Sequence, residues 1–334
     1  MEAGSITTSG GRRTFARPPL ARVPDRALRW GLLGTAAAIL ALIAFFFVRL
    51  YVEAHPAFQR FGFFGYTFDN NWDVSRETFG AAPLLVGTLV TSAIALAIGV
   101  PVAVATALYL TELAPRRVRG PLTVMVELLA AVPSVVFGLW GIFVLIPKLR
   151  PAEQWFSDTF GFLPFVGGTV AGPNYFIAGL ILAIMILPIV SAITREVMAT
   201  VPPDQKEAAL ALGATRWEMI RTAVLPYSRA GIAGASMLGL GRAIGKTIAV
   251  TLVIGNAPTI GKHIFDQGYT LAAVIANEFG EANKPHRGAL IAAGLVLFVL
   301  TLIVNLIARW FVRRAERGRR AVTGTQTAAA GAVG

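Results

Sequence analysis

The chain has 334 residues, of which 55% are hydrophobic and only 14% are charged. Soluble domains carry about 25% charged residues, so this composition excludes a typical soluble protein and indicates several membrane spans. The chain has no cysteine, which excludes disulfides, thiolate catalysis and thiolate metal sites. Its three histidines, His55, His263 and His286, lie in separate polar stretches, so we expect no bound metal and no cofactor.

Six apolar runs follow one another along the chain. Each is long enough to cross a hydrocarbon layer of about 30 Å at about 1.5 Å per helical residue. The runs cover residues 30–51, 84–110, 122–146, 176–193, 230–254 and 289–311. We therefore predict an all-α integral membrane protein with six transmembrane helices.

The two ends of the chain differ from this apolar middle. Residues 1–29 are rich in Arg, Gly, Ser, Thr and Pro, and residues 313–334 are rich in Arg, Ala, Gly and Thr. Both have the composition of disordered tails, which leaves residues 30–312 as the transmembrane domain. The first apolar run is longer than the roughly 7–15 residues of a signal peptide and is followed by no small-x-small cleavage site, so we expect an uncleaved anchor.

The Lys and Arg residues fall mainly on one side of the predicted spans. Twenty of the 30 lie before the first run, between the second and third, between the fourth and fifth, or from the last residues of the sixth run onward. Eight lie at the end of the first run or in the alternate segments. Loops rich in Lys and Arg stay on the cytoplasmic side, so we predict that both termini are cytoplasmic. Because membrane topology explains the net charge of +12, no nucleic-acid partner is expected.

The predicted cytoplasmic loop at residues 195–228 carries a regular pattern of helix signals. Pro202 and Pro203 end one helix, and Asp204 is suited to cap the next. The Ala- and Leu-rich segment that follows stops at Gly213, as helices often do at glycine. We therefore predict two short helices on the inner face of the membrane, the second ending before Pro226.

This loop resembles the EAA loop of ABC-importer permeases. Glu-Ala-Ala at residues 207–209 is followed by three residues, Gly213, nine residues and then Ala-Val-Leu-Pro at 223–226. The family pattern has Ile where this chain has Ala223. The resemblance implies a coupling helix that docks into a groove on an ATPase subunit. The coupling residues that it implies are Glu207, Ala208, Ala209, Gly213, Leu225 and Pro226.

A wider resemblance covers roughly residues 84–310. The segments ELLAAVPSVVFGLWGIFVL at 127–145 and GLGRAIGKTIAVTLVIGN at 239–256 look like the PstC-type permease subunit of phosphate ABC importers. This resemblance implies the type I ABC importer permease (MetI-like) fold, with a core at about 84–311. It also implies four kinds of contact: a second permease (PstA-like), ATPase subunits (PstB-like), an external phosphate-binding protein (PstS-like) and membrane lipid. Phosphate is the implied substrate.

Two basic residues lie inside the fifth apolar run. An ionisable side chain at the centre of a membrane costs at least about 2.5–3.5 kcal/mol, so it indicates a water-filled path, an anionic substrate or an internal ion pair. If the run is one helix, Arg242 lies about 18 Å from its inner end, with Lys246 one turn further on the same face. Glu127 is the only acidic residue as deep in the third run. An ion pair between Arg242 and Glu127 and a role of Arg242 in the substrate path both remain open.

The resemblance assigns roles around these cations. The phosphate-importer motif reads Gly-Arg-Ala-x-Gly-Glu-Thr, with its Arg and Glu implicated in phosphate passage. Arg242 and Thr247 match it, but Lys246 stands where the family has Glu, so the acidic role cannot be carried over. The predicted substrate-path residues are Arg242, Lys246, Thr247 and Glu127. With Lys246, the path is two charges more positive, which would strengthen the attraction of an anion.

Small residues recur every fourth position in this run. Ala235 and Gly239 form one such row, and Gly241, Gly245 and Ala249 form another. Small residues at this spacing allow close helix approach, and we expect them to pack against the second permease.

The Gly-Lys-Thr at 245–247 does not complete a nucleotide-binding phosphate loop, because that loop needs glycine at position 240, where this chain has leucine. The chain is therefore predicted to be a transport subunit without a catalytic site. A permease for sulfate or molybdate is the nearest alternative, and a secondary transporter is a more distant one.

Overall fold

The computed structural model describes residues 22–331 apart from 169 and 171, and it describes side chains within residues 27–310. By its contacts, the chain divides into two units, Met1–Arg49 and Leu50–Gly334. Helix α1 (Arg22–Phe61) contributes to both. In the first unit its apolar side chains, such as Trp30, Leu33 and Phe45, are exposed. The predicted tails lie largely outside the described side chains, and their disorder stays a prediction, although the backbone of α13 continues as helix to Gly331.

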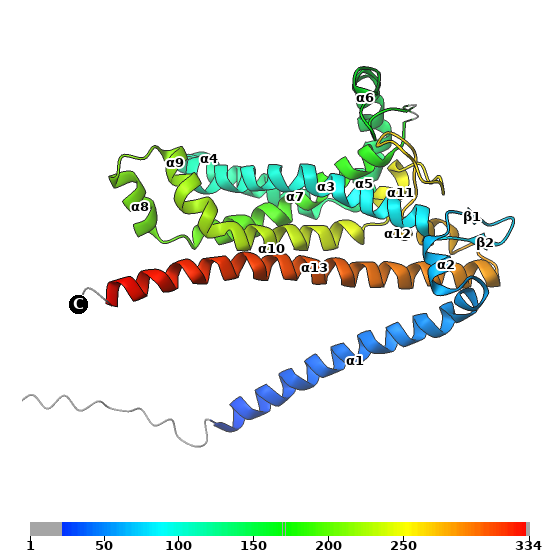
Figure 1. Ribbon diagram of the computed structural model, residues 1–334, viewed down its shortest axis with the longest axis horizontal. Helices are drawn as coiled ribbons and strands as arrows, with labels where there is room; N and C mark the ends of the chain where they lie inside the picture. Colours follow the sequence, from blue (N-terminus) through cyan, green and yellow to red (C-terminus); the bar gives the residue numbers. More distant parts are fainter. Residues whose placement is uncertain (1–21, 169, 171, 332–334) are drawn as a thin grey trace, which may run out of the picture. The chain divides into compact units, whose positions relative to one another are not determined.

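Four long helices of the second unit lie side by side: α3 (Ala82–Leu108), α7 (Tyr175–Ala199), α10 (Leu225–Ile244) and α13 (Lys284–Gly331) (Figure 1). Helix α7 is the most buried of the apolar helices, and residues such as Ile177, Ile181 and Ile186 form the core around it. Helix α3 packs close to α7 because Gly99 leaves room for Ile186. Apolar helices of this length confirm the predicted mostly helical membrane fold.

The third apolar run is divided, so the single span predicted at 122–146 is wrong. Helix α4 (Arg116–Ala131) ends before Val132, and α5 (Ser134–Trp140) begins after Pro133. Proline has no backbone N–H to donate and disfavours the helical conformation in the residue before it. Val132 and Pro133 accordingly both have extended backbone. The chain continues through a π-helical turn, η3 (Gly141–Leu145), into α6 (Ile146–Phe160), so that the apolar helix here is Ser134–Phe160.

The fifth apolar run is also divided. Helix α10 ends at Ile244, residues 245–247 are not helical, and α11 (Ile248–Val253) follows. The prediction of one continuous helix is therefore wrong, because Gly245 is a poor helix former and ends α10. Five helices in the described part of the chain are long and apolar enough to cross a membrane. They are Ala27–Phe61, Ala82–Leu113, Ser134–Phe160, Tyr175–Ala199 and Lys284–Trp310.

A second core cluster closes one end of the bundle, and we call this the hairpin end. It contains α2 (Phe63–Phe68), the antiparallel strands β1 (Trp72–Asp73) and β2 (Thr78–Phe79), and α12 (Leu271–Glu278). Tyr66 on α2 donates a hydrogen bond from its hydroxyl to the carbonyl of Ala289 at 2.6 Å, and burial raises the pKa of this tyrosine. The hairpin end is thus fixed to the start of α13.

Three short helical segments lie at the opposite end, which we call the loop end. They are α8 (Pro203–Ala211), α9 (Arg216–Met219) and the π-helical turn η4 (Ile220–Val224). Two short helices were predicted here, and α8 and α9 confirm them. The predicted end of the second helix before Pro226 is wrong, because its helical backbone continues through η4 into α10. Figure 1 shows α8 and α9 projecting beyond the bundle. A second π-helical turn, η2 (Tyr109–Leu113), extends α3 toward them. Met198, Ile220 and Val224 form the small core at this end.

Gly87 allows a testable prediction about this packing. A Cβ added to Gly87 on α3 would collide with the backbone carbonyl of Tyr269, which cannot move without shifting the loop before α12. We expect Gly87→Ala to destabilise the protein by about 1–3 kcal/mol, as overpacking does. Gly234→Ala on α10 is the matched control, since no heavy atom lies within 4 Å of the added carbon. The melting temperature of the purified protein in detergent should fall only for Gly87→Ala; an equal effect of both changes would contradict this account.

Candidate functional site

The break between α10 and α11 is the first part of the candidate site. Arg242 lies in the last turn of α10 and is exposed, whereas Lys246 and Thr247 are half-buried in the non-helical residues that follow. The break is held by short-range hydrogen bonds: Lys246 N–H donates to Ala243 at 3.2 Å, and Thr251 N–H donates to the Thr247 carbonyl at 3.0 Å. The structure therefore keeps Arg242, Lys246 and Thr247 together, but on a bent backbone and not on one face of a straight helix.

The break carries two positive charges without a carboxylate. Lys246 lies close enough to Arg242 for their charges to repel each other. Within the described side chains, neither residue forms an ion pair with Asp or Glu. Two adjacent cations are costly inside a membrane unless water, an anion or another subunit compensates them. The arrangement is suited to attracting an anion.

Glu127 does not pair with Arg242. Its Oε1 atom lies 2.9 Å from a guanidinium nitrogen of Arg195, whose other terminal nitrogen donates to Thr123 at 2.8 Å. These contacts join α4 to α7. The alternative of an Arg242–Glu127 ion pair is therefore not what the structure contains. Arg195 begins the predicted cytoplasmic loop, 68 residues from Glu127, so the sequence pattern did not indicate this pair.

The loop end presents most of the predicted coupling residues on one exposed surface. Glu207 and Ala208 on α8 are exposed, and Ala209 is half-buried. Gly213 follows the helix with a φ of 85°, a left-handed conformation that glycine adopts without strain. The predicted cap by Asp204 is wrong: the residue lies in the first turn of α8, and Pro202 at the N-cap makes no side-chain hydrogen bond. Asp204 still places a negative charge at the positive end of the helix.

The sequence analysis did not identify two large apolar residues that are exposed at the loop end. Leu212, at the end of α8, is 90% exposed, and Trp217, in α9, is 60% exposed. Their signal in the sequence was apolar side chains at positions that the EAA pattern leaves variable. Leu225 and Pro226, by contrast, are half-buried at the start of α10, where Leu225 packs against the small core of this end. The exposed surface is therefore formed by α8, the turn at Gly213 and α9.

An ion pair and a capping box hold this surface in place. The Nζ atom of Lys206 on α8 lies 2.6 Å from Oε1 of Glu112 in η2, and these side chains are only 23% and 10% exposed. At the start of α9, Thr215 and Glu218 exchange side-chain-to-backbone hydrogen bonds. The hydrogen bonds from the backbone N–H and the hydroxyl of Thr215 hold the pKa of the Glu218 carboxyl below its usual range. The loop end is thus tied to α3 through the Lys206–Glu112 pair.

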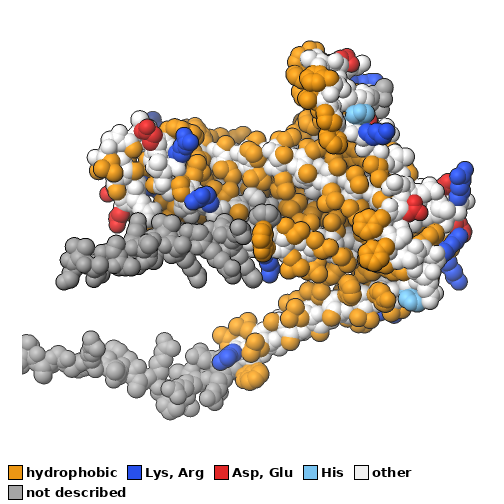
Figure 2. Space-filling model, in the orientation of Figure 1, with side chains coloured by type: hydrophobic (Ala, Val, Ile, Leu, Met, Phe, Trp, Pro, Cys, Tyr) orange, Lys and Arg blue, Asp and Glu red, His pale blue; other side chains and the backbone are white. Residues whose placement is uncertain are grey.

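The surface of the second unit is apolar in its middle and charged at its two ends. Figure 2 shows hydrophobic side chains covering the middle of the visible face, with charged side chains gathered toward the hairpin end and the loop end. Exposed Val124, Leu128, Leu302 and Leu306 contribute to the apolar surface. A broad exposed apolar band between two charged ends is what a lipid environment requires.

The sequence matches to known proteins include both the break between α10 and α11 and the loop end. Residues 99–317 match the family model described as "Binding-protein-dependent transport system inner membrane component". The chain is 41% identical over 287 residues to the phosphate transport system permease protein PstC of Pasteurella multocida, covering 84% of this chain and 89% of that protein. It is 45% identical over 310 residues to the phosphate transport system permease protein PstC 2 of Mycobacterium tuberculosis, covering 88% and 96%.

A solved structure shares the fold. The chain superposes with a TM-score of 0.57 on a chain of the bacterial alginate ABC transporter crystallised with an alginate pentasaccharide-bound periplasmic protein. The match covers 87% of this chain and 96% of that chain at 18% sequence identity. At this identity the likeness concerns the fold alone. The expected fold of an ABC importer permease is confirmed.

The Lys206–Glu112 ion pair supports a prediction about the loop end. Lys206→Met or Glu112→Gln should loosen α8, and amide hydrogen exchange in α8 should rise about fivefold, because a partly exposed ion pair is worth about 1 kcal/mol. The exchanged pair, Lys206→Glu with Glu112→Lys, should restore slow exchange. Lys284→Met, at the hairpin end, is the control. If α8 exchanges equally in all variants, the ion pair does not hold the helix.

Proposed function

Because the chain belongs to the binding-protein-dependent transport system inner membrane component family, we propose that it is the PstC-type permease of an ATP-driven importer of inorganic phosphate. Members of this family are membrane components of transport systems, so the chain is a transport subunit and not an enzyme. One observation carries the choice of phosphate: relatives named for phosphate transport are 41–45% identical over 84–88% of this chain. That alignment is long enough to include both the loop end and the break.

The orientation proposed from the charges places the loop end in the cytoplasm, together with both termini. Twenty of the 30 Lys and Arg residues lie in the segments assigned to that side. The hairpin end then faces the outside, where the proposed phosphate-binding protein (PstS-like) delivers its cargo. The break between α10 and α11 lies between these two ends.

The proposed substrate path runs past this break. Arg242 and Lys246 attract phosphate, and the Thr247 hydroxyl offers a hydrogen bond to it. An interrupted helix at this depth is tolerated where the backbone lines a water-filled cavity, which is how several transporters hold small ions. Glu127 is proposed to border the path from α4, where it is held by Arg195. The second permease (PstA-like) supplies the opposite wall.

Coupling to ATP hydrolysis is proposed to pass through the loop end. Glu207, Ala208, Ala209 and Gly213 contact the ATPase subunit (PstB-like), with Leu212 and Trp217 as apolar anchors. The small side chains permit close approach, and Glu207 can pair with a basic group. From α9 the helical backbone continues through η4 into α10, which ends beside Arg242 and Lys246. Leu225 and Pro226 lie at that junction, so a displacement of the loop end moves the break.

The test of this function is uptake of labelled phosphate by membranes that contain the complete importer. Arg242→Gln should lower uptake roughly tenfold to hundredfold, because a charge-assisted hydrogen bond to an anion contributes about 1.5–3 kcal/mol. Arg229→Gln removes an exposed cation from the same helix and should leave uptake close to normal. Lys246→Glu, which restores the family residue, should change the dependence of uptake on phosphate concentration.

The outcomes are distinct. Unaltered uptake in Arg242→Gln, at normal amounts of the complex, would contradict the role of Arg242 in the path. Uptake of labelled sulfate or molybdate by the same membranes, with no uptake of labelled phosphate, would instead assign the permease to another oxyanion. Co-purification of an ATPase with the chain separates both from a secondary transporter.

A further inference from the structure

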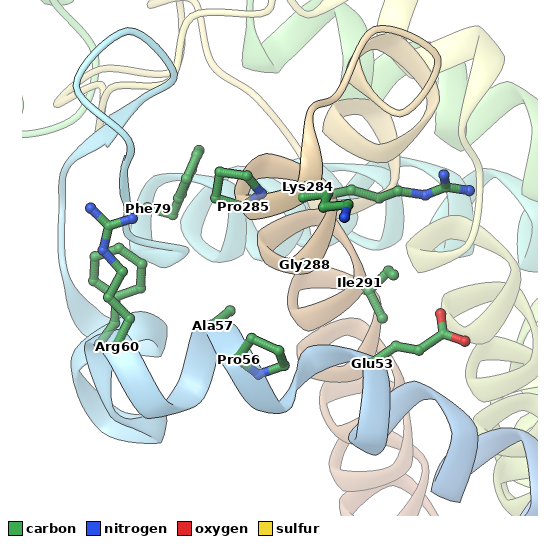
Figure 3. Close-up of a pocket in the computed structure, with 11 residues that line it drawn as sticks. Glu53, Pro56, Ala57, Arg60, Phe79, Lys284, Pro285, Gly288 and Ile291 are labelled. Carbon is green, nitrogen blue, oxygen red and sulfur yellow. The ribbon is translucent and has the colours of Figure 1, made fainter.

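A cavity of about 570 Å³ opens at the hairpin end, apart from the break and the loop end. It lies within the Leu50–Gly334 unit, between the last turns of α1, strand β2 and the first turns of α13. Figure 3 shows Pro56, Ala57 and Arg60 on α1 across from Pro285, Gly288 and Ile291 on α13. Nothing in the proposed transport cycle uses this space.

The cavity combines an apolar wall with basic side chains. Its apolar lining is formed by Pro56, Ala57, Phe61, Phe79, Pro285 and Ile291. Its cations are Arg60, Lys284 and Arg287, and Glu53 is its carboxylate. A cavity of this composition suits an amphipathic anion better than a fully hydrated one.

Two of the three cations have no carboxylate partner among the described side chains. Arg60 is paired with Glu77 at 3.2 Å. Arg287 lies over the ring of Phe279, with 4.7 Å from the guanidinium carbon to the ring centre, and forms no ion pair there. Lys284 has neither a hydrogen bond nor an ion pair through its side chain in the described part. Lys284 and Arg287 are therefore available to an anion.

The walls of the cavity are fixed before any ligand binds. The ring of Phe79 stacks on His286 at 5.4 Å and 6°, and Phe79 is only 2% exposed. His286 Nε2 lies 2.9 Å from Oε2 of Glu278, which also accepts a hydrogen bond from Trp72 at 3.2 Å. These contacts join β1, β2 and α12 to the start of α13. Because this wall is already ordered, a ligand would bind at little ordering cost.

The position of the cavity along the apolar helices indicates where its ligand lies. The apolar helix Ala27–Phe61 ends beside it, and the apolar helix Lys284–Trp310 begins at it. Helix ends of this kind lie at the level of the lipid headgroups, where Lys and Arg side chains meet phosphate groups. A phosphate group attached to an apolar body is present at that level in every phospholipid bilayer.

We propose that this cavity binds one membrane phospholipid, with Lys284 and Arg287 contacting its phosphate and the wall of Phe61 and Ile291 contacting its glycerol and acyl portion. The site is separate from the transport path and does not depend on phosphate being the substrate. Its role is to hold the end of α1 against the start of α13 through a bound lipid.

The experiment measures lipid that is retained by the full-length chain, purified in mild detergent and supplied with phosphatidylglycerol. Native mass spectrometry should find a tightly retained phosphatidylglycerol. The variant Lys284→Gln with Arg287→Gln should weaken its retention roughly tenfold to thirtyfold, as expected for two basic side chains near a lipid phosphate. The matched control is Arg150→Gln with Lys262→Gln, which removes two exposed cations that do not line the cavity.

A second variant tests the cavity without changing its charge. Gly288 lines it, and the nearest atom to a Cβ added there is the Glu53 carbonyl oxygen at 4.0 Å. Gly288→Phe should therefore fill the cavity and displace the lipid while the protein still elutes as a single species.

Three results would overturn the proposal. The first is equal retention by the wild type, the cavity variants and the control. The second is equal retention of phosphatidylglycerol and diacylglycerol, since the latter has no phosphate. The third is binding of inorganic phosphate, dependent on Lys284 and Arg287, by a protein that retains no lipid, which would make the cavity a site for free phosphate.

Discussion

Close packing between two interrupted helices is the constraint on which the rest of the site depends. Helix α5 follows the break at Pro133, α11 follows the break at residues 245–247, and the two pack against each other. Gly138 makes this contact possible: a Cβ there would lie 2.5 Å from Cδ1 of Leu252 and 3.2 Å from Cα of Ala249. Any larger residue at 138 would push α11 away. The position of Lys246 and Thr247 therefore depends on a glycine in another helix.

A continuous helical backbone also joins the loop end to the break between α10 and α11. Residues from Arg216 to Ile244 form one helical path through α9, η4 and α10, interrupted only by a change in winding at η4. The capping box at Thr215 and Glu218 fixes one end of this path. The other end carries Arg242. A π-helical turn often marks a functional position, and here it lies where the loop end joins the membrane helix. A displacement of α9 can therefore reach Arg242 along hydrogen-bonded backbone.

The sequence predicted the helices that depend on local apolar composition and missed the features that depend on distant contacts. The runs at 84–110, 176–193 and 289–311 became helices because most of their residues are apolar. Hydropathy could not locate the two breaks, since Pro133 and Gly245 lie inside apolar runs. The partner of Glu127 was unpredictable because Arg195 approaches it only after α4 packs on α7. The coupling motif located α8 and Gly213, whereas its last two residues, Leu225 and Pro226, are half-buried at the start of α10, where Leu225 packs against the small core of the loop end.

The small residues of α10 show how the two cations fit into this fold. Ala235 is fully buried, and a Cβ on Gly239 would meet Val190 of α7 at 2.7 Å, so this row packs within the chain and not against a second permease. Gly241 and Gly245 have no neighbour closer than 3.8 Å. They flank exposed Arg242, and no described carboxylate pairs with it. An uncompensated cation is costly against lipid, so if this face of α10 lies within the membrane it requires a polar environment. In the proposed importer, a second permease packed against Gly241 and Gly245 would form a water-filled space around Arg242 and Lys246. An anion that entered this space would neutralise their charges.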